Sequence, residues 1–101
     1  MPSREQKLAG RLLRYQLALL LFETQRPMTV AELAVALSSL GHVPPGRPSK
    51  LVSDALRWEV RRGRVRRLGR NGYATGRIPE STRRWMRRSL EEHGCAGSAA
   101  L

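Results

Sequence analysis

Apolar side chains in the first quarter of the chain repeat with the period of an α-helix. They are separated by four, three, four and three positions at Leu8, Leu12, Tyr15, Leu19 and Phe22. Further leucines widen this stripe until the second half of the segment is apolar nearly all round, as in a helix that is buried on most sides. The pattern predicts a helix over residues 4–25 at the centre of the core, with Pro27 just beyond its end.

The second predicted element begins with a capping box, Thr29-Val-Ala-Glu32. In this motif the Thr29 hydroxyl accepts a hydrogen bond from the Glu32 amide, while the Glu32 carboxylate accepts one from the Thr29 amide. A helix is therefore predicted over residues 30–40, and Gly41 is a natural stop.

A loop rich in Pro and Gly at 42–48 precedes a third helix, predicted over residues 49–62. This helix begins at Ser49 or Pro48, and Gly63 ends it. Its polar side chains share one face, and the opposite face is apolar. The apolar face consists of Leu51, Val52, Ala55 and Leu56.

The dipeptide Asn71-Gly72 predicts a β-hairpin over residues 64–77, because both residues accept the positive φ of a type I′ turn. The predicted pairs are Arg70 with Tyr73, Leu68 with Thr75, and Val65 with Ile78. Pro79 opens a last helix, predicted over residues 79–93, in which Trp85 and Met86 belong to the core or to a dimer interface. The small residues of 94–101 predict a disordered tail.

Length and composition limit the class of protein. The 101 residues accommodate one domain, assigned to residues 1–93. The longest apolar run, Leu17 to Phe22, is far shorter than the ~20 residues that a membrane helix needs. The first residues lack the pattern of a signal peptide, and the single cysteine, Cys95, excludes a disulfide scaffold.

The charge of the chain is both large and unevenly placed. There are 19 basic and eight acidic residues, a net charge of +11, and 14 of the basic residues but only three of the acidic ones lie between 47 and 88. Such clustering indicates a polyanionic partner, most simply nucleic acid. We therefore expect a cytoplasmic, nucleoid-associated protein. A GC-rich genome would explain the preference for Arg over Lys, but not the clustering.

The order helix, helix, loop, helix, hairpin, helix resembles that of winged helix-turn-helix DNA-binding proteins. The resemblance covers residues 8–78, and Val52-Ser-Asp-Ala-Leu-Arg-Trp-Glu-Val-Arg-Arg-Gly63-Arg-Val65 looks like the segment from recognition helix to wing in small bacterial repressors. It implies a mainly α fold with a small β-hairpin, a winged helix-turn-helix with an added C-terminal helix. Residues 79–93 look like the extra helix through which many such regulators dimerise, so a homodimer through the first and last helices is implied.

The polar face of the helix at 49–62 supplies candidates for contact with DNA. At about 100° per residue these side chains fall within one arc of about 140°. By the resemblance, this helix enters the major groove of double-stranded DNA, and Arg57 is the best candidate for a guanine contact. The candidates are Ser49, Lys50, Ser53, Asp54, Arg57 and Arg61. The alternative is an ordinary solvated helix face.

The predicted wing supplies a second group of candidates. Its basic and amide side chains suit the DNA backbone or a narrow minor groove. These candidates are Arg64, Arg66, Arg67, Arg70, Asn71 and Arg77. The alternative is that they keep an exposed strand edge soluble. Four further arginines between 83 and 88 either extend the basic surface or only solvate the last helix.

Glu59 falls within the apolar arc of the third helix. A buried carboxylate is costly unless it is paired. We therefore predict an arginine partner, either Arg14 or Arg84, or exposure of Glu59 at the helix end.

Residues with catalytic or metal-binding chemistry are scarce. The only histidines are His42 and His93, and the only aspartate is Asp54. No Gly-rich phosphate loop, nucleophile–base pair or metal-ligand cluster is evident. We expect no catalytic residues, no metal, no cofactor and no small-molecule substrate.

Three functions remain after these arguments. The first is a sequence-specific bacterial transcriptional regulator, and the second is a nonspecific nucleoid-type DNA-binding protein. The third is a protein- or RNA-interaction module on a winged-helix scaffold, since a fold does not fix a function. Replacing Arg57 by alanine should abolish site preference in the first case, lower affinity uniformly in the second, and change nothing in the third.

Overall fold

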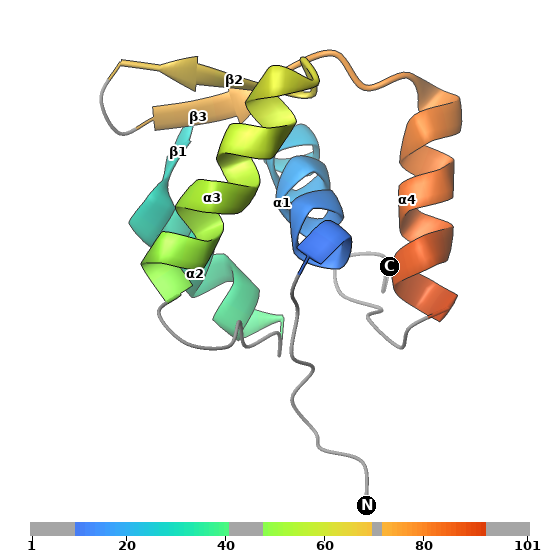
Figure 1. Ribbon diagram of the computed structural model, residues 1–101, viewed down its shortest axis with the longest axis horizontal. Helices are drawn as coiled ribbons and strands as arrows, with labels where there is room; N and C mark the ends of the chain where they lie inside the picture. Colours follow the sequence, from blue (N-terminus) through green and yellow to red (C-terminus); the bar gives the residue numbers. More distant parts are fainter. Residues whose placement is uncertain (1–9, 41–47, 70–71, 93–101) are drawn as a thin grey trace, which may run out of the picture.

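The computed structural model describes residues 10–40, 48–69 and 72–92, which form a mainly helical structure with a small antiparallel sheet (Figure 1). The helices are α1 (Gly10–Thr24), α2 (Val30–Ser39), α3 (Pro48–Arg61) and α4 (Glu80–Glu92). The strands are β1 (Met28–Thr29), β2 (Val65–Leu68) and β3 (Gly72–Thr75). The predicted helices are thus confirmed over the described residues, with ends that differ by one position. The expectations for residues 4–9, 42–47 and 94–101 lie outside those residues.

Local sequence signals account for where the first two helices end and begin. Gln25 has a positive φ of 55°, and its amide donates to the Leu21 carbonyl at 3.1 Å, which closes the last turn of α1. The predicted capping box of α2 is confirmed. The Thr29 amide donates to Glu32 at 2.8 Å, and the Glu32 amide donates to the Thr29 hydroxyl at 3.1 Å.

The sheet has the strand order β1-β3-β2, with both neighbouring pairs antiparallel. The short strand β1 pairs Met28 with Tyr73, and the sequence pattern did not predict it. It joins the start of α2 to the hairpin formed by β2 and β3. Two residues are too few for a period-two pattern to be recognised.

The predicted register of the hairpin is wrong. Leu68 pairs with Gly72 and Val65 with Thr75, so three residues, not two, connect the strands. Gly69, at a φ of 62°, takes the first loop position. In this register Val65 and Tyr73 lie on the same face, where both are buried, whereas the predicted register would place them on opposite faces. Burial of one face therefore outweighs the preference of Asn71-Gly72 for a type I′ turn.

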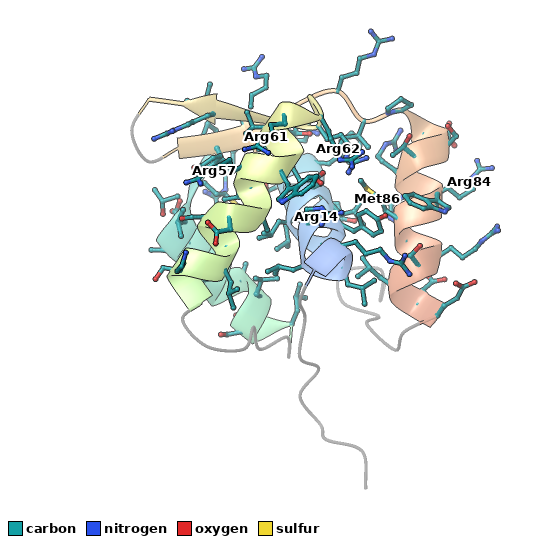
Figure 2. All side chains as sticks on the ribbon, viewed as in Figure 1. Arg14, Arg57, Arg61, Arg62, Arg84 and Met86 are labelled. Carbon is teal, nitrogen blue, oxygen red and sulfur yellow. The ribbon has the colours of Figure 1, made fainter. Side chains whose placement is uncertain are left out.

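The core forms around α1, which packs against α3, α4 and β3 (Figure 1). Leu17, Leu19 and Leu21 of α1 are completely or almost completely buried, as the sequence pattern predicts for a central helix. Met86 points from α4 toward α1 and is also fully buried (Figure 2). The helix α2 packs against α3, and its buried residues Leu33 and Leu37 belong to the same core. This core fixes α3 and leaves one of its faces uncovered.

Within the described segments, no helix is both long enough and apolar enough to cross a membrane.

Candidate nucleic-acid interface

The two predicted faces of α3 are confirmed by the burial of its side chains. Leu51 is half-buried, and Val52, Ala55 and Leu56 are buried against the core. The opposite face is open to solvent or only partly covered. It carries Ser49, Lys50, Ser53, Asp54, Arg57 and Arg61. The packing of α3 therefore brings all six predicted candidates of this helix together on one side.

Two of these candidates are engaged with each other. The Lys50 ammonium lies 3.3 Å from the Asp54 carboxylate, one helical turn away. The Lys50 side chain is 73% exposed and that of Asp54 46% exposed, so solvent screens this pair and it contributes little to stability. Arg57 has no carboxylate within ion-pair distance among the described residues. It lies on the side of α3 nearer the hairpin (Figure 2).

The hairpin brings a second set of candidates beside α3. Arg66 and Arg67 of β2 are exposed, and so is Arg77, which follows β3. The predicted candidates Arg70 and Asn71 lie outside the described residues.

Arg64 is placed differently from the other wing candidates. Its Nε and Nη2 atoms donate to the two carboxylate oxygens of Glu59, at 2.7 and 2.8 Å. The Glu59 side chain is 0% exposed and that of Arg64 only 15% exposed, so the guanidinium is turned into the protein. The hydrogen bonds to Glu59 hold the pKa of Arg64 above its ordinary value, against the lowering effect of burial.

The predicted partners of Glu59 were Arg14 and Arg84. Arg14 is a partner, since its Nε atom lies 3.5 Å from the Glu59 carboxylate. Arg84 is not, because it pairs with Glu80 on the same helix at 3.1 Å and points away from the core (Figure 2). Sequence analysis missed Arg64 because its partner lies across the turn that follows α3, outside helical spacing.

The arginines of α4 divide between two roles. Arg83 lies over the Phe22 ring, with 4.2 Å between its Cζ atom and the ring centroid. Arg87 pairs with Glu23 at 3.3 Å. Both therefore hold α4 against α1, whereas Arg84 and Arg88 are exposed.

A cluster of arginines around Trp58 was not predicted from the sequence. Arg14, Arg61 and Arg62 all have their Cζ atoms within 6.0 Å of the centroid of the Trp58 ring, which is 46% exposed. We call these four residues the Trp58 cluster. Part of this cluster could have been predicted from the sequence, because Arg61 and Arg62 follow Trp58 at the helical spacings of three and four. Through Arg14, which belongs to α1, the cluster also joins α3 to α1.

The described residues contain no group of three or more potential metal ligands. His42, His93 and Cys95 lie outside them. No family model, curated protein or solved structure matches the chain.

Proposed function

We propose that this protein is a winged-helix, sequence-specific transcriptional regulator that binds double-stranded DNA. In this proposal α3 reads base edges in the major groove, and the hairpin of β2 and β3 contacts the backbone or the minor groove. The observation that carries the proposal is the uncovered polar face of α3 beside the exposed arginines of the hairpin. The element order and the strand order β1-β3-β2 are compatible with a winged-helix layout.

The dimensions of α3 support this mode of binding. A helix with its side chains is about 10–12 Å across, which suits the major groove, about 12 Å wide. The exposed face presents hydroxyl, carboxylate and guanidinium groups, which can pair with base edges. Arg57 is the strongest candidate for a bidentate contact with guanine, because it is exposed and has no carboxylate partner in the described ranges.

Net charge supports a DNA partner of either kind, specific or nonspecific. The net charge of +11 favours binding to any DNA duplex, because basic side chains that contact phosphates release the counterions held there. The many exposed arginines also suit a nonspecific nucleoid-type protein, which is the second candidate function.

Binding to a random-sequence duplex pool at two salt concentrations, with sequencing of the bound fraction, separates these functions. With about six to eight phosphate contacts, log K should fall with log salt at a slope of about −5 to −7. An enriched motif supports the regulator. A steep slope without a motif supports the nucleoid-type protein. Absence of binding at low salt overturns both and directs attention to a protein or RNA partner.

The proposal includes a homodimer formed through α1 and α4. Its support is Trp85, which is 51% exposed on α4 and lies 5.1 Å from the ring of Tyr15 on α1, measured between ring centroids. A half-exposed tryptophan is typical of an interface anchor. In sedimentation equilibrium the wild type should be a dimer, and the Trp85→Ala variant should dimerise more weakly. A monomeric wild type at all concentrations contradicts this part.

A further inference from the structure

The Trp58 cluster is the feature of the surface that the proposed function does not use. Trp58 is 46% exposed, although tryptophan side chains are highly buried on average in folded domains. Arg14 lies closest to the ring, with its Cζ atom 5.0 Å from the centroid, followed by Arg62 at 5.6 Å and Arg61 at 6.0 Å. The exposed aromatic ring thus gathers three guanidinium groups at one place.

Most of the positive charge of this cluster is not neutralised within the protein. Neither Arg61 nor Arg62 has a carboxylate within ion-pair distance in the part of the chain that the structure describes. Arg14 approaches Glu59, but Glu59 already accepts two shorter hydrogen bonds from Arg64. The buried Nε atom of Arg14 also has no hydrogen-bond acceptor among the described residues. Of the three cations, only Arg14 lies within ion-pair distance of a carboxylate among the described residues, and that carboxylate is already held by Arg64, which leaves a site for an anion.

The cluster also has a definite position relative to α3. Arg14 and Arg62 lie on the side of this helix that faces α1 and α4, while Arg57 lies on the side nearer the hairpin (Figure 2). Arg61 belongs both to the cluster and to the polar face of the helix. A helix seated in the major groove has a row of phosphates on each side, because it nearly fills the width of the groove. The hairpin and the part of the Trp58 cluster formed by Arg14 and Arg62 lie toward different sides of α3 (Figure 2).

We propose that the Trp58 cluster binds a backbone phosphate on the side of the major groove opposite the hairpin. This inference rests on the proposed function, since it assumes that α3 enters the groove. Arg61 and Arg62 donate hydrogen bonds to the phosphate oxygens, and guanidinium groups suit this contact because they bind such oxygens in pairs. Arg14 adds charge from α1.

Trp58 acts in this site as a positioning residue. Its ring attracts the guanidinium groups electrostatically and holds their long side chains near one place before DNA arrives. Arranging the donors in advance reduces the side-chain entropy that is lost on binding. The ring itself contributes no charge, so its effect can be separated from that of the arginines.

The test measures DNA affinity as a function of salt for a fixed duplex from the selection above. The variants are Arg62→Gln, Trp58→Leu and Trp58→Phe. The matched control is Arg88→Gln, which removes the same charge from the exposed part of α4. Arg62→Gln should reduce the salt slope by about 0.9 and the affinity in 0.1 M salt about eightfold, if the affinities converge at 1 M. Trp58→Leu should weaken binding about two- to fivefold, and Trp58→Phe should restore much of the loss.

Several outcomes would overturn the inference. If Arg62→Gln has the same salt slope as Arg88→Gln while the wild type binds DNA, the inference fails and the proposed function survives. If the wild type binds no duplex at low salt, both fail. Thermal unfolding of each variant checks that the fold is kept, and the exposure of Trp58 and Arg62 makes large losses unexpected.

A free phosphate compound is the other source of the same chemistry. In a Trp85→Phe background Trp58 is the only tryptophan, so its fluorescence reports on the cluster. Pyrophosphate titrated at constant ionic strength should change this fluorescence only weakly, without saturation below millimolar concentration. Saturation at micromolar pyrophosphate, together with an unchanged DNA salt slope in Arg62→Gln, would assign the cluster to a free phosphate compound instead.

Discussion

Glu59 near the end of α3 and Arg64 just before β2 are joined by two parallel side-chain hydrogen bonds, of 2.7 and 2.8 Å. The Arg64 amide also donates to the Glu59 carbonyl, at 3.1 Å. This double link spans the turn at Gly63, where φ is 76°. It therefore sets the angle between the helix and the hairpin, the two elements proposed to contact DNA.

We expect Arg64→Ala to lower the free energy of unfolding by about 3 kcal/mol, because it leaves the buried Glu59 carboxylate with only the more distant Arg14. Arg66→Ala, two positions along, should change stability by less than about 0.5 kcal/mol, since Arg66 is exposed. Urea unfolding followed by circular dichroism measures both. Equal stabilities of the two variants would show that the ion pair is not structural.

Arg64→Lys should make stability sensitive to alkaline pH. In the wild type the pKa of Arg64 is raised above its usual value, so its contribution to stability is fully present below the usual arginine pKa and is lost only as pH rises through the folded-state pKa. A lysine beside Glu59 also gains a raised pKa, but from a reference of about 10.4. The difference in unfolding free energy between wild type and variant should therefore be constant from pH 7 to 9 and grow above about pH 10. A difference that stays constant to pH 11 contradicts this.

The exposed arginines of α3 and of the hairpin should differ in their effect on sequence preference. Arg57→Ala should cost about 1–3 kcal/mol on the preferred duplex and relax the preference at one base pair, because a base contact is lost. Arg66→Ala should weaken binding to all duplexes alike and reduce the salt slope by about 1. Competition binding on the preferred site and single-base variants of it measures both. Equal losses on every duplex for Arg57→Ala would favour the nonspecific function.

Gln16 offers a test of the core that does not involve DNA. It is 1% exposed on α1, and its Nε2 atom has no hydrogen-bond partner among the described residues. Gln16→Leu keeps a similar volume and removes the unpartnered amide. We expect it to raise the free energy of unfolding by about 1 kcal/mol, since burying an unpaired polar group is costly. A loss of stability in thermal unfolding would show that the amide has a partner.

The helices could be predicted from the sequence because their signals are local. The leucine stripe of α1, the capping box at Thr29 and the two faces of α3 each lie within a few residues of chain. The exposure of the polar face of α3 followed from the same period. Burial of Glu59, and its need for an arginine partner, also followed from its place on the helix.

The features that could not be predicted depend on contacts between distant segments. The register of the hairpin follows from burying Val65 and Tyr73 together, which the turn dipeptide does not encode. β1 exists only because β3 is there to pair with it. Arg64 can be distinguished from the exposed arginines of the hairpin only when the position of Glu59 in space is known. A pattern of arginines in sequence does not distinguish those that hold the fold from those that stay exposed.

The pairing of Met28 with Tyr73 has a consequence for how the chain folds. These residues are separated along the chain by α2, α3 and β2, so β1 cannot pair until these elements have come together. Closing so long a loop costs chain entropy, and only the few contacts of β1 offset this cost. Such non-local contacts slow folding. We expect β1 to join last, after the hairpin has docked on α1. Substitutions at Met28 should then speed unfolding while leaving the rate of folding almost unchanged.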